Sequence, residues 1–288
     1  MTHFTDWLAA GPLVADGAWG TELQKQGLPP GECPDLWNLR YPERVETVAR
    51  AYCDVGSRII LTNTFRANAI SLPDRDVRAI NQAGVEISRR SARGRARVAA
   101  SIGPSGKMLC SGDITRDALA EAFAGQAQAL SAAGADALLI ETMSDIDEAR
   151  IAVRAALATG LPVIASFVFD TGRNKDRTMT GATPEQVAAA MAAEGVDAVG
   201  ANCGSGIEGF ISICRRLHAA CDRPVWIKPN AGLPVMEAGR ITYRTTPEQF
   251  AAHVPALFQA GASFIGGCCG TSPAFVQAIA SARATLCG

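Results

Sequence analysis

Eight short apolar runs alternate with eight segments of helical periodicity, and this alternation limits the possible fold more than any other feature of the 288 residues. Strands that alternate with helices predict a parallel sheet, because consecutive parallel strands need a crossover connection. Eight such units in a chain of this length predict one single-domain (β/α)8 barrel over residues 1–288. The predicted strands span 13–17, 58–65, 98–104, 137–143, 162–170, 196–204, 224–232 and 264–270.

The segments between the predicted strands show the periodicity of amphipathic helices. In the segment 184–194, proline occupies the first turn and Gly195 follows the end, which is the usual asymmetry of helix termini. The Gly- and Pro-rich region 27–42 is expected to be a loop. The predicted helices span 42–56, 75–95, 115–133, 145–159, 184–194, 207–221, 247–260 and 273–284.

An open, doubly wound sheet is the alternative architecture for the same alternation. It would require a phosphate-binding G-x-G-x-x-G sequence after the first strand. The sequence DGAWG at residues 16–20 does not match that pattern, so the barrel is preferred.

Polar and sulfur-containing residues gather at the carboxyl ends of the predicted strands. In barrel enzymes these ends form one active-site mouth, so we expect the residues to share a site. Each carboxylate has an alternative role, which is to brace a loop through main-chain N–H groups. The residues are Asp16, Asn63, Glu141, Asn202, Cys203, Asn230, Cys268 and Cys269.

Two strand-like runs end in cysteine. The run at 198–204 ends at Cys203, and the run at 264–271 reaches Cys268 and Cys269 between flanking glycines. The glycines let the backbone turn sharply and let another group approach closely. Three soft thiolates that leave a fourth position open are the ligand set of a catalytic zinc ion.

The cysteines have other possible roles. A lone cysteine is most often a small buried hydrophobic residue. A disulfide between adjacent cysteines is strained, and a structural zinc site usually shows four ligands with paired C-x-x-C spacing. The open three-cysteine site is therefore preferred, and the small hydrophobic role is expected for Cys33, Cys53, Cys110, Cys214, Cys221 and Cys287.

The chemistry of such a site follows from its charge. Three thiolates on Zn²⁺ give a formal charge of -1, which suits binding and activation of a further thiol better than hydrolysis. No predicted strand end carries a histidine base. The pattern therefore predicts alkylation of a sulfur amino acid. Asp16 and Glu141 would hold its ammonium group, and the N–H groups around Gly17 and Ala18, or the amide of Asn230, would hold its carboxylate.

Six motifs carry a resemblance to a known family: DGAWGTE at 16–22, LTNTF at 61–65, ETM at 141–143, GANC at 200–203, PNAG at 229–232 and GGCCGT at 266–271. Over essentially its whole length the chain resembles the zinc-dependent homocysteine S-methyltransferases. The resemblance implies a (β/α)8 barrel in which a zinc-bound homocysteine thiolate attacks a donor methyl group. It implies zinc ligands at Cys203, Cys268 and Cys269, and homocysteine contacts at Asp16, Gly17, Ala18, Glu141 and Asn230.

The resemblance leaves the methyl donor open. Members of the family use glycine betaine, S-methylmethionine, related sulfonium compounds or a methylated cobalamin. The betaine-using animal branch has a tyrosine directly after the glutamate, where this chain has Thr142. Trp19 and Trp37 are candidate donor-binding aromatics, since an indole ring attracts a cation. Trp19 has packing as an equal alternative, and Trp37 is expected in a mobile loop.

The sequence is compatible with three functions. The first is methyl transfer from a small onium donor to homocysteine. The second is methyl transfer to another thiol, or from a separate corrinoid protein. The third is a zinc-binding redox switch without catalysis. The third is disfavoured because a sensor needs neither Asp16 nor Glu141 at the mouth.

The remaining sequence features bear on partners and location. A net charge of -1 gives no argument for nucleic acid or an anionic membrane, and no apolar run approaches the length of a membrane span. Nine cysteines without framework spacing, and a start that lacks a signal-peptide pattern, predict a reducing cytoplasm. The expected partners are homocysteine and a small methyl donor. The apolar helix faces permit a homo-oligomer.

Overall fold

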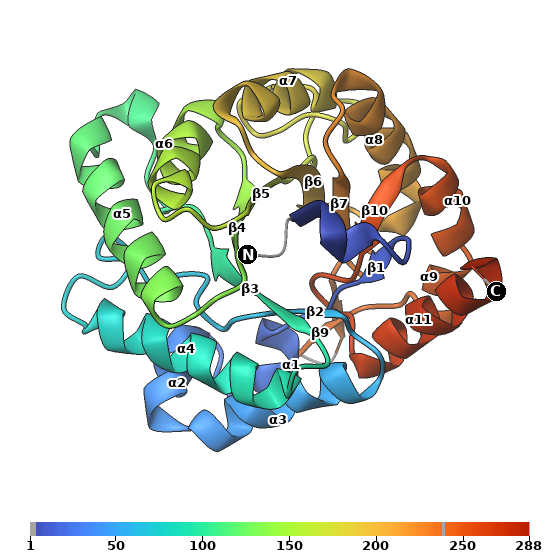
Figure 1. Ribbon diagram of the computed structural model, residues 1–288, viewed down its shortest axis with the longest axis horizontal. Coiled ribbons are helices and arrows are strands. Elements are labelled where there is room, and N and C mark those ends of the chain that lie inside the picture. The colour runs from blue at the N-terminus through green and yellow to red at the C-terminus, as the bar shows by residue number, and fades with distance from the viewer. Residues whose placement is uncertain (1–3, 238–239, 288) are drawn as a thin grey trace.

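Eight parallel strands form one sheet in the order β1-β10-β7-β6-β5-β4-β3-β2. A parallel bridge between Ala15 and Ile59 joins the first strand to the second, so the sheet closes on itself. This computed structural model describes residues 4–237 and 240–287. Helices surround the strands on every side (Figure 1). The predicted (β/α)8 barrel is thereby confirmed.

Except for β4, which matches the predicted run 137–143, the strands are shorter than the apolar runs that predict them. Their inner and outer faces are both covered, which explains why the runs are continuously apolar rather than alternating. At the carboxyl ends the chain leaves the hydrogen-bonded ladder and forms the loops of the mouth. The strands are β1 (Leu13–Val14), β2 (Ile59–Leu61), β3 (Arg97–Ile102), β4 (Ala137–Met143), β5 (Val163–Phe167), β6 (Ala198–Cys203), β7 (Val225–Pro229) and β10 (Ala262–Ile265).

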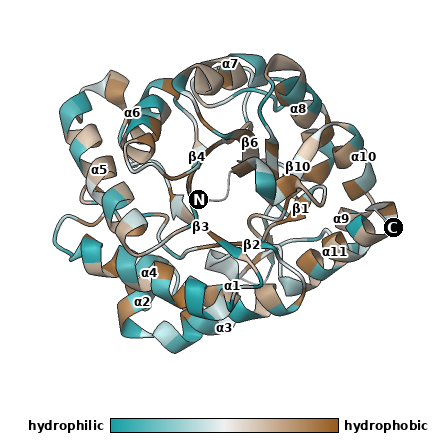
Figure 2. Ribbon diagram, in the orientation of Figure 1, coloured by the Kyte–Doolittle hydropathy of each residue, from teal (hydrophilic) through white to brown (hydrophobic). Residues whose placement is uncertain are grey.

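The outer helices agree with the predicted segments except at one place. The predicted helix 247–260 is two helices, because Pro255 lacks the N–H that a continuous helix would need there. Figure 2 shows apolar and polar residues alternating along the helices, as expected for helices with one buried face. The helices are α3 (Pro42–Asp54), α4 (Val77–Ala92), α5 (Arg116–Ala132), α6 (Ile146–Leu157), α7 (Pro184–Glu194), α8 (Ile207–Ala220), α9 (Pro247–Ala251), α10 (Val254–Gln259) and α11 (Pro273–Cys287).

Two helices begin with a complete capping box. Thr183 accepts from the N–H of Gln186, whose side chain accepts from the N–H of Thr183, and Thr246 and Gln249 repeat the arrangement. Each box satisfies two N–H groups that the first helical turn leaves without partners. These caps fix where α7 and α9 begin, and therefore the lengths of the mouth loops before them.

The region 27–42, predicted as a loop, contains short helical elements. Here lie the 3-10 helix η2 (Pro34–Leu36) and the helix α2 (Trp37–Arg40); α1 (Gly20–Lys25) comes before them and η3 (Leu109–Ser111) follows β3. In the part of the chain that the structure describes, no helix has the length and apolarity needed to cross a membrane.

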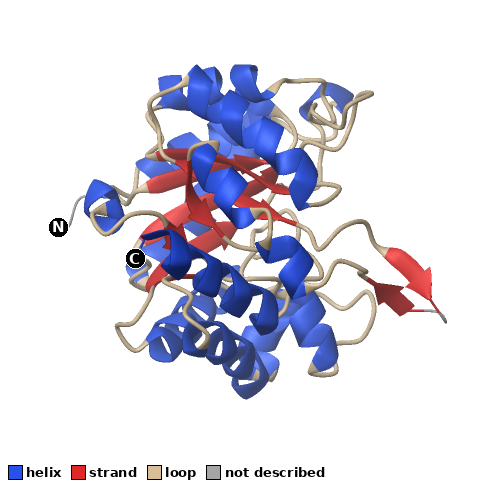
Figure 3. Cartoon of the chain, turned by 90° about the vertical axis from the view of Figure 1, so that its right-hand side faces the viewer, coloured by secondary structure: helices blue, strands red, loops and turns tan. Residues whose placement is uncertain are grey.

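The two ends of the barrel differ. At the amino ends of the strands, the 3-10 helix η1 (Phe4–Leu8) lies across the opening, and Phe4 packs on Phe264 inside with ring centroids 5.6 Å apart. At the carboxyl ends, an antiparallel hairpin of β8 (Val235–Glu237) and β9 (Arg240–Thr242) projects from the loop after β7. Figure 3 shows η1 and the hairpin at opposite ends of the molecule.

Gly200 on β6 gives a test of the barrel packing. A Cβ atom there would lie 2.3 Å from the carbonyl oxygen of Trp226 on β7. Gly200→Ala is therefore expected to lower the free energy of unfolding by at least about 2 kcal/mol, because the contacted oxygen belongs to the backbone of the neighbouring strand β7 and cannot move aside. Urea denaturation measures the change.

Gly125→Ala is the matched control. Gly125 is an exposed residue of α5, and a Cβ atom there meets nothing within 4 Å. Alanine should raise the unfolding free energy by about 0.5–1 kcal/mol through its helix propensity. Equal effects at the two glycines would contradict the described packing between β6 and β7.

Candidate functional site

Three cysteine side chains meet at the carboxyl end of the barrel. Cys203 ends β6, while Cys268 and Cys269 follow β10, and only β7 separates the two strands. The Sγ atoms of Cys203 and Cys268 lie 3.1 Å apart, and all three Sγ atoms lie within 4.8 Å of one another. The structure thus brings together the three cysteines that the sequence placed at strand ends.

Main-chain hydrogen bonds hold the cysteine-bearing turns to β7. The N–H of Cys268 donates to Pro229 at 2.8 Å, and the N–H of Asn230 donates to Cys203 at 3.0 Å. The N–H of Ala231 donates to the carbonyl of Cys269 at 3.0 Å. Because Cys203 itself has a left-handed φ of 64°, its turn is held in a conformation that few non-glycine residues adopt. The thiols are therefore presented by a rigid frame.

The donor set fits a soft divalent metal ion. Three sulfur atoms within 4.8 Å of one another can share one tetrahedral ion and leave a fourth position for a substrate. Hydrogen bonds from Cys203 and Cys268 lower the pKa of the Cys269 thiol to about 3, and hydrogen bonds to Cys268 and Cys269 raise the pKa of Cys203. Three thiolates at this spacing need a cation to offset their repulsion.

Asn202 orients the residues around the thiols, a role that its place at a strand end did not reveal. It is fully buried, and its Nδ2 donates to Thr142 Oγ1 at 2.7 Å and lies 3.4 Å from Cys203 Sγ. Its Oδ1 accepts from the N–H of Thr142 at 2.9 Å and from Ser166 at 2.7 Å. Asn202 thereby links the ends of β4, β5 and β6 beside the three thiols.

Glu141 lies at the end of β4, buried except for 8 % of its surface. It accepts a hydrogen bond from the hydroxyl of Ser101. Burial raises the pKa of this carboxyl to about 7; the nearby Lys228 ammonium opposes the shift, and Cys268 adds to it. Because ionising this buried carboxyl costs free energy, a cationic ligand bound beside it would stabilise the ionised form.

Asp16, which the sequence placed at the mouth, is fully buried and already bound by the chain. Its Oδ2 accepts from the N–H of Leu61 at 2.7 Å and from Trp19 Nε1 at 2.8 Å, and its Oδ1 pairs with the ammonium of Lys228. Sequence reasoning missed Lys228, although a lysine inside the apolar run VWIKP is a clear sign of a buried partner. The pair places a compensated charge beneath the mouth.

The turn after Asp16 is locked by Tyr52. The Tyr52 hydroxyl lies 2.7 Å from the carbonyl oxygen of Ala18 and 3.1 Å from that of Thr271. The N–H of Ala18 donates to Thr271 at 3.1 Å, so the chain itself occupies this amide, which the sequence assigned to a substrate carboxylate. Gly17 must be glycine here, because a Cβ would lie 2.8 Å from the Tyr52 ring.

Asn230 is oriented differently from the expectation. Its Nδ2, expected to hold a carboxylate, donates to the carbonyl of Gly204 at 2.8 Å. Its Oδ1 is buried and has no hydrogen-bond partner among the described residues. A buried acceptor of this kind calls for a donor from outside the chain.

Asn63 braces a loop instead of facing the mouth. Its Nδ2 donates to the carbonyl of Pro34 at 2.8 Å and to Asn38 Oδ1 at 3.0 Å. The remaining cysteines with described side chains lie outside the three-cysteine cluster. The side chain of Cys287 is not among those described, and of the three histidines His3 lies outside the described residues.

The two tryptophans proposed for the donor differ in position. Trp37 is 1 % exposed, begins α2, and packs on Tyr41 with Arg44 against its ring. The expectation of a mobile-loop aromatic is therefore corrected: apolar burial fixes Trp37 in the core. Trp19 is partly buried, and its ring nitrogen is committed to Asp16.

Tyr243, just after the hairpin, was not singled out from the sequence. Burial and the neighbouring Cys269 raise the pKa of its phenol to about 12. Its ring lies against Gly270, where a Cβ would come within 2.3 Å of it. Only the folded hairpin brings this aromatic to the thiols, which explains why its sequence context gave no signal.

The fold and the site together define a (β/α)8 barrel protein with a three-cysteine site suited to a metal ion. The family model described as homocysteine S-methyltransferase matches residues 13–283. The chain belongs to the homocysteine S-methyltransferase family.

Two curated relatives and one solved structure illustrate the similarity. The methionine synthases of Mycobacterium tuberculosis and Mycobacterium leprae are each 32% identical to this chain, over 99% and 98% of its length. The chain spans about a quarter of these relatives, 26% and 25%. The metallated homocysteine methyltransferase MmuM from Escherichia coli superposes with a TM-score of 0.77 at 26% identity, covering 94% of this chain and 96% of that one.

Lys228→Met tests the buried ion pair. We expect the variant to lose about 3–5 kcal/mol of unfolding free energy, because Asp16 would remain buried without its counter-charge. Adding Asp16→Asn should recover much of this loss, since the double variant has no unpaired charge. Urea denaturation of the metal-free single and double variants gives the coupling energy. Additive losses would contradict a direct pair.

Glu141→Gln tests the cost of the buried carboxylate in metal-free protein. The pKa of Glu141 is about 7 in the folded chain against 4.5 ordinarily, so its ionisation lowers stability as the pH rises from 4.5 to 7. Glutamine can still accept from Ser101 but does not titrate. At pH 8 the free energy of unfolding of the variant should exceed that of wild type by up to roughly 3 kcal/mol, and at pH 5 the difference should be much smaller. A pH-independent difference in urea denaturation would contradict this assignment.

Proposed function

We propose that this chain transfers a methyl group from a small onium donor, such as S-methylmethionine or betaine, to the thiolate of homocysteine, forming methionine. The observation that carries the proposal is the convergence of three Sγ atoms within 4.8 Å in a member of this family. The sulfur of homocysteine forms the new C–S bond, and the donor's C–S or C–N bond breaks with its electron pair on the leaving atom. No further reactant is needed.

Cys203, Cys268 and Cys269 would hold a zinc ion. When bound, zinc would lower the pKa of the homocysteine thiol so that the thiolate is available at neutral pH. Asn202 supports the arrangement, because its amide contacts Cys203 and fixes Thr142 beside it. Such outer hydrogen bonds keep metal ligands in place.

The amino-acid part of homocysteine would bind between Glu141 and Asn230. The carboxylate of Glu141 and the unpartnered Oδ1 of Asn230 are both acceptors, and they suit the substrate ammonium. The main-chain N–H of Gly17 is the candidate for the substrate carboxylate, with Ala18 shaping the same turn. Asp16 acts through Lys228 and Trp19, holding that turn in place.

The donor would approach the sulfur from the aromatic side of the mouth. Tyr243 lies next to Cys269, and Trp19 lies next to Asp16. Aromatic rings near a methyl-bearing cation stabilise its charge through the cation–π interaction, and Tyr243 and Trp19 are the candidates. Trp37 is left out because it is buried.

A second candidate is methyl transfer from a separate corrinoid protein. The observation that favours it is the 32% identity to methionine synthases of which this chain spans about a quarter. In that reaction the methyl group would come from a corrinoid, and the same thiol site would serve both reactions.

Methionine formation by the purified, zinc-loaded protein tests the proposal. Homocysteine is offered with S-methylmethionine, glycine betaine, S-adenosylmethionine or dimethylsulfoniopropionate in separate reactions. We expect turnover with one onium donor. Cys268→Ser should lose zinc and lower the rate by at least about 100-fold, since even outer-shell changes at metal sites cost 10–100-fold. Cys110→Ser is the matched control, because Cys110 is exposed and lies outside the cluster.

Two results would contradict the proposal. Full activity of Cys268→Ser without bound metal would show that the three-cysteine cluster is not needed for methyl transfer. If no methionine forms with any of the four donors at one zinc per chain, the proposal of an onium donor is wrong. Activity on adding a methylated corrinoid protein would then establish the second candidate.

A further inference from the structure

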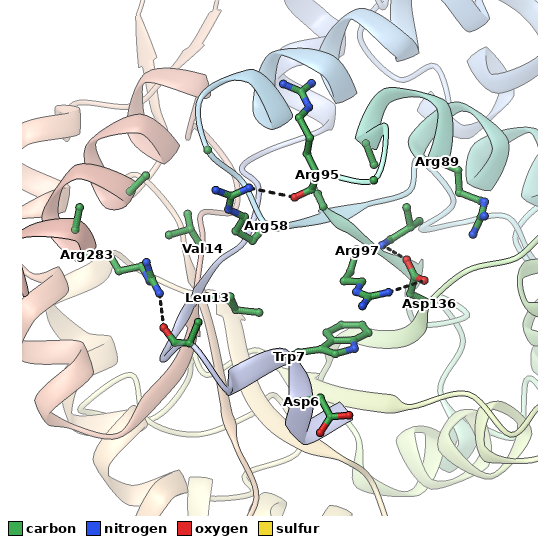
Figure 4. A pocket seen from close by; sticks show the side chains of 18 of the residues that line it. Asp6, Trp7, Leu13, Val14, Arg58, Arg89, Arg95, Arg97, Asp136 and Arg283 are labelled. Atoms are coloured by element: carbon green, nitrogen blue, oxygen red, sulfur yellow. Dashed lines mark hydrogen bonds and ion pairs between the residues drawn. The ribbon is translucent and has the colours of Figure 1, made fainter. Parts of the chain in front are cut away.

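A hollow lies at the end of the barrel opposite the cysteines. Its volume is about 1110 Å³, and it is bounded by η1, by the amino ends of β1 and β3, and by parts of α4 and α11. The cysteines lie at the carboxyl ends of strands of the same barrel, so this hollow is separate from the proposed methyl-transfer site. Figure 4 shows it from close by.

Guanidinium groups dominate the wall of this hollow. Six arginines line it, against two aspartates, Asp6 and Asp136. The chain as a whole has a net charge of -1, so this concentration is a local feature and not a result of basic composition. In Figure 4, Arg58, Arg97 and Arg283 lie on three sides of the hollow. The six are Arg58, Arg89, Arg90, Arg95, Arg97 and Arg283.

Three of the arginines are paired with carboxylates. Arg90 pairs with Glu46 at 2.8 Å and Arg95 with Asp54 at 2.8 Å. The guanidinium of Arg97 lies 3.8 Å from Asp136, which is at the limit of an ion pair. The carboxylates of Glu46 and Asp54 are not part of the wall, so they offset positive charge at its edge.

The other three arginines bond to main-chain carbonyl oxygens. Arg58 donates to Arg95 at 3.3 Å, Arg89 donates to Gly134, and Arg283 donates to Ala10 at 2.8 Å and also to Pro12. A guanidinium has five N–H donors, so these bonds use only part of its capacity. Among the described residues, no carboxylate forms an ion pair with Arg58, Arg89 or Arg283. Holding the stems in place in this way pre-organises the remaining donors for an anion.

We propose that this hollow binds a small organic molecule that carries two or more phosphate groups. A tetrahedral phosphate offers oxygens in several directions, which matches guanidinium groups that come from different walls. The volume exceeds what one phosphate needs and is sufficient for a molecule with an organic body. Leu13, Val14 and the ring of Trp7 supply an apolar surface for that body.

Isothermal titration calorimetry of the zinc-loaded protein tests the site with four probes: orthophosphate, inorganic diphosphate, ADP and citrate. Ionic strength is held constant with sodium chloride, because screening alone weakens contacts with exposed arginines. We expect one saturable site per chain with sub-millimolar affinity for diphosphate and ADP, and weaker binding of orthophosphate. The ligand should also raise the melting temperature, since it binds only the folded chain.

Two variants each remove one guanidinium group, at the adjoining amino ends of β2 and β3. Arg58→Gln and Arg97→Gln should each weaken ADP binding by about tenfold or more, the loss expected for one charge-assisted contact. Arg116→Gln is the matched control: Arg116 is also exposed and ion-paired, to Asp147 at 3.0 Å, but lies outside the hollow. All three variants should retain wild-type methyl transfer, which separates this test from that of the proposed function.

Three outcomes would overturn the proposal. The first is an absence of saturable binding by diphosphate and ADP. The second is binding that Arg58→Gln and Arg97→Gln, each shown by circular dichroism to be folded, leave unchanged. The third is citrate binding as tightly as ADP, which would make the hollow a carboxylate site.

Discussion

Asp16 lies at the seam where the barrel closes, and its main-chain and side-chain atoms bond to three other parts of the sheet. Its N–H donates to Ile59 on β2, its carbonyl accepts from Gly267 after β10, and its carboxylate accepts from Leu61 and pairs with Lys228 on β7. The first strand is only two residues long, so these bonds compensate for a short ladder. The segment that follows Asp16 therefore enters the mouth at a fixed angle.

The cysteine site depends on that closure. Cys268 and Cys269 follow the strand next to β1, and Gly267 is bound directly to Asp16, so the position of the thiols is coupled to the seam. Charge is arranged in the same small volume: the ammonium of Lys228 lies among groups that are anionic or become so, Asp16, Glu141 and the thiols. A substrate ammonium and a divalent cation would complete the balance that Lys228 begins.

Much of this molecule was predictable because strand periodicity and strand ends are local features of a sequence. The eight strands, the outer helices and the three cysteines follow from runs of apolar residues and from what comes directly after them. The burial of Trp37, the break at Pro255 and the hairpin that precedes Tyr243 depend on packing that no local pattern contains. The arginine-lined hollow could not be predicted either, because its wall joins residues as distant as Trp7 and Arg283.

Thr142 and Cys203 share one more property, since both have left-handed backbones, with φ of 61° and 64°. Neither is glycine, so each holds roughly 1–3 kcal/mol of backbone strain, and Asn202 bonds to both. A chain optimised for stability alone would have glycine at these two positions and would lose the side chains that the site uses. Engineering for heat resistance would thus meet a stability–activity trade-off at the ends of β4 and β6, and further stability is better sought in the outer helices.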